Sequence, residues 1–271
     1  MVRFVRSNMN MVKTPKELAF LRDLYVAPDW TQRFTDLFDT NFRFADESEI
    51  LYVNGGTGKH PLELRQKLNL DSRLSAYAAD EESNILARAK ADLLDVEIRF
   101  SNEFPRETFD LVIADGSFVR PENVGEFLDE VIDLADKRIA FFLPTAGSFG
   151  EIFSFIWESL LKTDLPDKGF EVERLITIIP HVSRIEEIAK RRGLSKLRTT
   201  TKSEIFDFEN GADFIDSPLV SDFLMPVWLE FLDDTEKERV SKMLTRLIDE
   251  NSENLSFRFT VKATLVSGEK S

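Results

Sequence analysis

Hydrophobic residues recur along the chain with the spacing of buried strands and of one-sided helices. Residues 49–53 form an apolar run that leads into a glycine-rich turn, and residues 96–100 alternate between apolar and other side chains. An apolar run is typical of a strand buried on both faces, and alternation is typical of a strand buried on one. Further strands are predicted at residues 74–80, 138–144, 199–208 and 255–266.

Helices are predicted around and between these strands. Thr14 and Glu17, with a proline after the threonine, have the order of a capping box, so a helix is expected to begin there. A second helix is expected from about Asp29, because Trp30 and Phe34 begin an apolar face that continues at helical spacing. Later patterns predict helices at residues 148–162, 172–179, 184–192, 213–232 and 235–251.

The turn after the first strand is the most informative segment of the chain. Gly56 and Gly58 lack the side-chain bulk that would keep a nucleoside or phosphate away from the backbone. Asp80 follows the next predicted strand, about twenty residues later, where an acceptor for ribose hydroxyls would lie. The segment therefore predicts a nucleotide-like ligand.

Spacing separates the ligand classes that use such a turn. A dinucleotide fingerprint would need a third glycine where Pro61 stands, so that match is weak. A phosphate-binding P-loop would need glycine at Val53 and a hydroxyl residue at His60, so it is excluded.

The turn resembles the first motif of class I S-adenosylmethionine-dependent methyltransferases, acidic-x-Gly-x-Gly-x-Gly. Gly56 and Gly58 match two of the three glycines, and Asn54 replaces the first. Asparagine tolerates the left-handed backbone region better than other non-glycine residues. Tyr52 stands at the acidic position, whose carboxylate in the family helps to hold the methionine end of the cofactor.

The resemblance continues to residue 144 or so. Asp80 corresponds to the family's ribose-binding acid, Ser101 and Asn102 stand where an adenine-binding acid is common, and residues 109–115 match the fourth-strand signature. The resemblance implies an α/β fold with a seven-stranded, mostly parallel sheet sandwiched by helices, in which strand seven runs antiparallel between strands five and six. The implied S-adenosylmethionine-binding residues are Asn54, Gly55, Gly56, Thr57, Gly58, Asp80, Glu81, Ser101, Asn102, Ala114 and Asp115.

The segments outside the central sheet are expected to cover the site. Residues 1–45 are predicted to be a leader and cap helices, and residues 46–271 a methyltransferase-like domain with a helical lid at about 212–251. Aromatic residues of the lid suggest either an apolar pocket wall or core packing. Tyr25 is the residue of the first helices that we expect at the site, whereas Trp30 and Phe34 are expected in the core.

Composition and net charge exclude or disfavour several classes of chemistry and of binding partner. The chain has no cysteine, which excludes disulfides and cysteine nucleophiles, and no histidine pair has metal-ligand spacing. A net charge of −14 disfavours nucleic acid, and no apolar stretch is long enough to span a membrane. We therefore expect a cytoplasmic protein with a small-molecule substrate.

Each motif residue also has a purely structural interpretation. The glycines could form a tight turn, Asp80 could cap the following helix, and Asp115 could be a turn residue. Their joint order favours methyl transfer to a small or lipophilic molecule, with a catalytically degenerate binding or regulatory protein as the alternative. Methyl transfer requires alignment more than a protein nucleophile, so no catalytic residue is predicted.

Overall fold

A computed structural model describes residues 13–251 and 256–270. Its centre is a sheet with the order β3-β2-β1-β4-β5-β7-β6, in which β7 is antiparallel to both neighbours and the remaining pairs are parallel. This order confirms the expected fold class, including the placement of strand seven. The strands are β1 Glu49–Val53, β2 Arg73–Tyr77, β3 Arg99–Ser101, β4 Phe109–Asp115, β5 Ala135–Thr145, β6 Leu194–Phe208 and β7 Phe257–Lys270.

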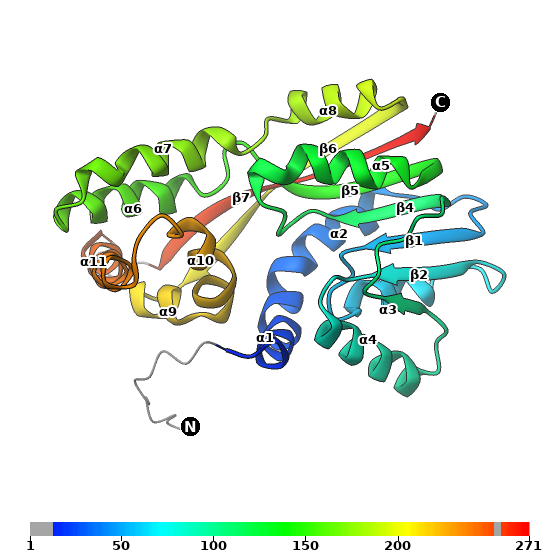
Figure 1. The fold of residues 1–271 in the computed structure, drawn as a ribbon, viewed down its shortest axis with the longest axis horizontal. Helices are drawn as coiled ribbons and strands as arrows, with labels where there is room; N and C mark the ends of the chain where they lie inside the picture. Colours follow the sequence, from blue (N-terminus) through cyan, green and yellow to red (C-terminus); the bar gives the residue numbers. More distant parts are fainter. Residues whose placement is uncertain (1–12, 252–255, 271) are drawn as a thin grey trace.

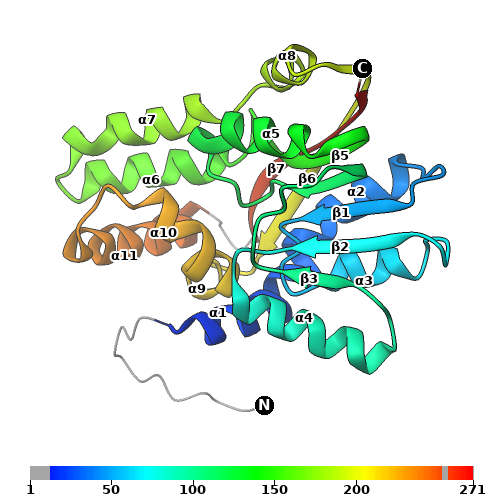
Figure 2. The same cartoon turned by 45° about the vertical axis from the view of Figure 1, so that its right-hand side comes forward.

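Helices cover both faces of the sheet (Figures 1 and 2). Alternate residues of a strand point to opposite faces, so Tyr52 packs in the core with α2 and α3 while Leu51 packs in the core with α5 and α8. One face carries η1 Arg22–Thr31, α2 Gln32–Asn41, α3 Lys59–Arg65 and α4 Glu81–Leu94, with α1 Pro15–Leu21 beside α4. The other carries α5 Val124–Asp133, preceded by η2 Pro121–Asn123, and α8 Val182–Arg191.

The first two predicted helices form one continuous helical segment. The expected capping box is present, since Glu17 N–H donates to the Thr14 hydroxyl and the Glu17 carboxylate accepts from Thr14 N–H. The expected break near Asp29 is wrong, because η1 continues α1 directly into α2 as a π-helix. Pro28 lacks an N–H and cannot join the normal helical ladder, and the wider turns absorb this gap. The predicted leader lies largely outside the described residues.

A group of helices packs at one end of the sheet (Figure 1). The predicted helix at 213–232 is in fact broken, because Pro218 follows an extended Ser217 at ψ 134° and Pro226 opens another short helix. The predicted helix at 235–251 is confirmed as α11, which packs on α6 and α9. The group comprises α6 Gly150–Lys162, η3 Pro166–Lys168, α7 Gly169–Ile178, α9 Gly211–Asp216, η4 Leu219–Leu224, α10 Met225–Trp228 and α11 Asp234–Asn251.

Element ends differ more than the elements themselves. The third strand begins at Arg99 rather than at 96, because Val96 N–H donates to the Ala91 carbonyl at 3.1 Å and still closes α4. The sixth strand begins earlier, at Leu194, directly after Gly193 ends the preceding turn with φ 84°. Among the described residues, no helix is long and apolar enough to cross a membrane.

Candidate functional site

The site lies where β1 and β4 end side by side. Asn54 adopts a left-handed φ of 60° and donates from Nδ2 to the Asp115 carbonyl at 2.9 Å. Gly56 and Gly58 then turn the chain into α3 at φ 54° and 83°. A Cβ on residue 58 would lie 2.7 Å from the Ala87 Cβ, so only glycine lets α4 approach this turn so closely.

The amino-terminal helical segment is fastened to the turn by Asp23. The Thr57 hydroxyl donates to the Asp23 carboxylate at 2.6 Å, and the Lys90 ammonium contacts the same carboxylate oxygen. Lys90 also donates to the Thr57 carbonyl at 3.1 Å. This arrangement joins η1, the turn and α4 at one point, so the segment before the sheet is part of the site.

Two cavities meet at the turn and share four lining residues, Arg22, Asn54, Gly56 and Asp115. The larger turn cavity, about 240 Å³, is also bordered by Asp80, Ser83 and Phe118. The smaller turn cavity, about 30 Å³, is also bordered by Tyr52, Thr57 and His60. A ligand lying along the turn would therefore meet Asp80 at one end and Tyr52 at the other.

Asp80 belongs to the helix and to the cavity at once. Its carboxylate caps α4 by accepting from the N–H groups of Glu82 and Ser83, both at 3.2 Å, and from the Ser83 hydroxyl at 2.6 Å. The capping interpretation is thus confirmed. The side chain is nevertheless exposed and borders the larger turn cavity, so its remaining lone pairs can accept hydrogen bonds from a ligand.

The centre of the site holds opposite charges. Burial raises the pKa of Asp115, and a hydrogen bond from the Ser117 N–H at 2.8 Å opposes that increase only in part. Burial lowers the pKa of Arg22, while the nearby Asp115 and Asp80 carboxylates act in the opposite direction. The Arg22 guanidinium also lies 5.3 Å from the ring centre of Phe118, as in a cation–π contact.

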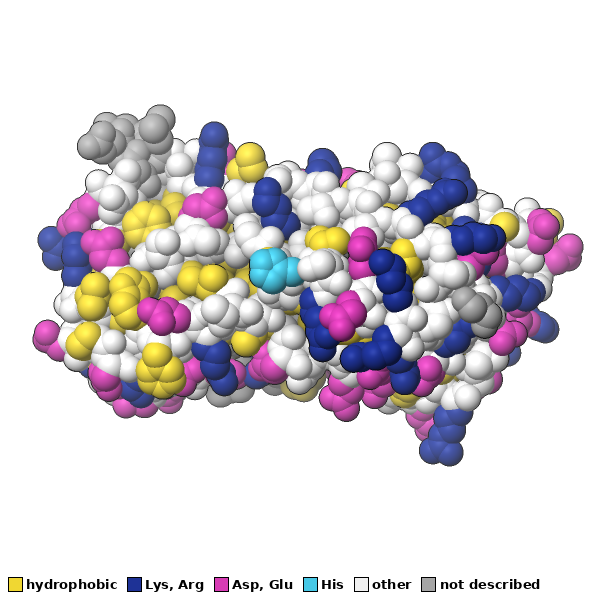
Figure 3. Space-filling model, turned by 90° about the horizontal axis from the view of Figure 1, so that it is seen from above, with side chains coloured by type: hydrophobic (Ala, Val, Ile, Leu, Met, Phe, Trp, Pro, Cys, Tyr) yellow, Lys and Arg dark blue, Asp and Glu magenta, His cyan; other side chains and the backbone are white. Residues whose placement is uncertain are grey.

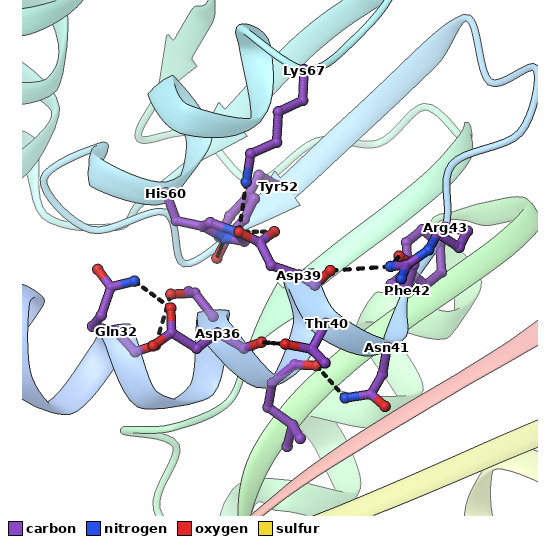
Figure 4. A network of polar contacts seen from close by, with 12 residues as sticks. Gln32, Asp36, Asp39, Thr40, Asn41, Phe42, Arg43, Tyr52, His60 and Lys67 are labelled. Carbon is purple, nitrogen blue, oxygen red and sulfur yellow. Dashed lines mark hydrogen bonds and ion pairs between the residues drawn. The ribbon is translucent and has the colours of Figure 1, made fainter.

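A chain of polar side chains ends at the smaller turn cavity (Figure 4). The Tyr52 hydroxyl lies 2.9 Å from His60 Nδ1, and His60 Nε2 lies 3.3 Å from the Asp39 carboxylate. The Lys67 ammonium donates to the other oxygen of Asp39 at 2.6 Å. Tyr52 and His60 are both buried, so this chain runs from the molecular surface to the cavity through β1, α3 and α2.

An apolar cavity of about 80 Å³ lies next to the larger turn cavity. Phe118 and Val119 border both. Of the aromatic residues in the predicted lid, Phe223 and Trp228 border the apolar cavity, whereas Phe214 is fully buried and contributes to the core. Both interpretations of the lid aromatics are therefore correct for different residues.

Solved structures with a similar fold include proteins described as methyltransferases. An S-adenosylmethionine-dependent methyltransferase from Geobacter sulfurreducens, solved with S-adenosyl-L-homocysteine, aligns with a TM-score of 0.55 and 10% identity over 96% of this chain and 100% of its own. The YcgJ protein from Bacillus subtilis aligns with a TM-score of 0.55 and 14% identity over 88% of this chain and 98% of its own. The chain has the class I methyltransferase fold. No family model and no curated protein sequence matches it.

Within this fold, the structure gathers part of the predicted residue set around the two turn cavities. The gathered residues are Asn54, Gly55, Gly56, Thr57, Asp80 and Asp115. Gly58 instead faces α4, Glu81 forms an exposed ion pair with Arg88, and Ala114 is buried in the core. Ser101 borders a different cavity, and its hydroxyl accepts from the Glu103 N–H. The exposed Asn102 and the half-exposed Tyr25 are not among the residues that border the turn cavities.

Sequence reasoning missed Arg22 and Val119, whereas the resemblance already implied that Phe118 lies at the carboxyl end of the fourth strand, where cofactor and substrate would meet. Arg22 is a polar position of the first predicted helix, and the apolar pattern there does not distinguish it from the other polar residues; its Cδ lies 3.8 Å from the Cβ position that Gly56 lacks. Val119 also follows the fourth strand, and that position was the available signal: ligands of parallel sheets bind outside the carboxyl ends of the strands.

Proposed function

We propose that the protein transfers a methyl group from S-adenosylmethionine to a small or lipophilic acceptor. One observation carries the proposal: the larger turn cavity and the apolar cavity share Phe118 and Val119 as a common boundary. Methyl transfer requires the acceptor atom, the methyl carbon and the sulfonium sulfur to be held in line. Two adjoining cavities, one polar and one apolar, suit that requirement.

The polar residues suggest how the cofactor would lie. The Asp80 carboxylate would accept hydrogen bonds from the ribose hydroxyls, and the glycine turn would allow close backbone approach. Arg22 borders both turn cavities and would pair with the carboxylate of the amino-acid tail, because a guanidinium matches a carboxylate geometrically. These residues bind and orient the cofactor, which itself supplies the transferable methyl group.

The apolar cavity, where the methyl acceptor would bind, favours a molecule with few polar groups. Trp30, Phe153 and Trp228 contribute aromatic surface to it. Among the described residues, the Trp30 Nε1 donor is buried without a hydrogen-bond partner. An oxygen atom of the methyl-accepting molecule that accepted this hydrogen bond would satisfy a donor that is otherwise costly to bury.

Calorimetry with S-adenosylmethionine and S-adenosylhomocysteine tests the cofactor, and methyl-labelled cofactor with a small-molecule extract tests turnover. Binding of both ligands with label transfer supports the enzyme. Absence of binding at about millimolar ligand, equivalent to roughly 4 kcal/mol of affinity, contradicts the proposal.

The alternative is a catalytically degenerate protein of this fold that serves as a binding or regulatory module. Three departures from the family motif favour it: Tyr52 at the acidic position, Asn54 at the first glycine, and Ser101 with Asn102 at the adenine-binding acid. Binding without label transfer to any acceptor would support this alternative.

A further inference from the structure

We propose that the Tyr52 hydroxyl, oriented by His60 and Asp39, receives the ammonium group of the cofactor's amino-acid tail. The inference rests on the proposed function and extends it to a specific group of the ligand. Tyr52 and His60 both border the smaller turn cavity, at the opposite end of the turn from Asp80. A ligand whose ribose is held at Asp80 would direct its other end there.

The proton positions follow from the chemistry of the three side chains. The Asp39 carboxylate can only accept, so His60 carries a proton on the Nε2 that faces it at 3.3 Å. In the neutral ring Nδ1 is then an acceptor, and the Tyr52 hydroxyl at 2.9 Å donates to it. The Tyr52 oxygen keeps its lone pairs for a donor in the cavity.

The charges around these three side chains keep their protons in this arrangement. Burial raises the pKa of Asp39, but hydrogen bonds from His60 and Lys67 outweigh burial and hold that pKa to about 2. Burial, with the nearby Asp115, Asp39 and Glu63 carboxylates, raises the pKa of Tyr52 well above its usual range. Asp39 is thus ionised and Tyr52 protonated near neutrality.

At this end of the site an ammonium would meet Tyr52 and Asp115. Lys59 also borders the cavity, and it donates to the Gln32 side chain at 2.5 Å. Asp115 borders the same cavity and contributes negative charge when ionised. Arg22 borders it too and would meet the opposite charge, the tail carboxylate. An amino acid carries one group for each. Tyr52 would then touch the ligand, whereas His60 and Asp39 are positioning residues that fix the orientation of its hydroxyl (Figure 4).

The test compares two ligands that share the adenosine part. S-adenosylhomocysteine carries the amino-acid tail, and 5′-methylthioadenosine lacks it. Tyr52→Phe should weaken binding of S-adenosylhomocysteine about 10- to 100-fold, as expected for loss of a hydrogen bond to a charged group, and leave 5′-methylthioadenosine within about 2-fold. Tyr77→Phe is the matched control, because Tyr77 pairs with Val53 at the end of β2 but borders a different cavity. It should change neither affinity.

A second variant keeps the proposal testable if Tyr52→Phe folds poorly. Asp39→Asn still offers an oxygen to His60 but removes the charge, and it should weaken S-adenosylhomocysteine selectively, by a smaller factor. Equal losses for both ligands, or no loss for the tailed ligand, would overturn the inference. Failure of both ligands to bind the unaltered protein would instead overturn the proposed function.

Discussion

At the scale of single residues, several side chains of the site also stabilise the fold. Asp80 caps α4 and borders the larger turn cavity, and Asn54 both adopts the left-handed conformation and anchors the end of β4. A variant can therefore lose binding through lost stability or through a lost contact. Paired substitutions separate these two causes.

Asp80 offers such a pair. Asp80→Asn should cap α4 almost as well as aspartate, whereas Asp80→Ala should lower the free energy of unfolding by about 1 kcal/mol. Both should weaken S-adenosylhomocysteine roughly 10- to 100-fold, since neither offers a charged acceptor for the ribose hydroxyls. Urea unfolding and calorimetry measure the two effects. If the Asp80→Asn variant bound S-adenosylhomocysteine as tightly as the unaltered protein, the proposed role of the Asp80 carboxylate in cofactor binding would be wrong.

Asp39 should make stability depend on acid. Its pKa is lowered from 3.8 to about 2 in the folded protein, so its contribution is complete above pH 3.8 and disappears as the pH falls towards 2. That contribution is on the order of 2 kcal/mol. Asp39→Asn should therefore be less stable than the unaltered protein near neutrality, and the difference should shrink between about pH 4 and pH 2. Unfolding curves with a constant difference would contradict this expectation.

At the scale of elements, hydrophobic patterns and a family signature together predicted the seven strands, and the resemblance to the methyltransferase family implied the sheet class. The predictions were wrong at two prolines. Pro28 lies inside the continuous helical segment, in η1, and Pro218 divides the helix predicted at residues 213–232. The glycine turn was visible because backbone shape dictates its residues. Arg22 was not, because its place at the turn depends on the packing of η1, and no local pattern encodes that.

Gly58 tests the contact between the turn and α4. Gly58→Ala should lower the free energy of unfolding by more than about 2 kcal/mol, because alanine disfavours the left-handed region and its Cβ would collide with Ala87. Gly125→Ala is the control, since nothing lies within 4 Å of the Cβ position in that helix. It should be neutral or stabilising by up to about 1 kcal/mol. Chemical denaturation of both variants decides the matter, and equal stabilities would be inconsistent with close packing here.

At the scale of the whole molecule, charge and apolar surface are unevenly distributed. On the face seen in Figure 3, hydrophobic side chains gather toward the α6–α7 end and basic side chains toward the α8 end. Leu161, Phe170 and Ile176 are among the exposed apolar residues of α6 and α7. Lys190 and Arg191 lie in the last turn of α8, where basic residues complement the helix dipole.

The basic end should not bind nucleic acid. The net charge of −14 opposes phosphate binding. Of the three consecutive basic residues 190–192, Arg192 is already paired with Asp133 and Asp129. A mobility-shift titration at physiological salt should show no binding of duplex DNA or RNA below about micromolar concentration. Salt-sensitive binding that disappears in Lys190→Ala with Arg191→Ala would contradict the expectation.

The aromatic boundary of the apolar cavity makes the protein its own optical probe. Two of its three tryptophans, Trp30 and Trp228, border that cavity, and both are almost completely buried. Indole emission depends on nearby dipoles and quenchers, so an occupant of the cavity should shift or quench the intrinsic fluorescence, while Trp157→Phe removes the remaining background. Acceptor candidates can then be sorted by emission alone, without cofactor or turnover.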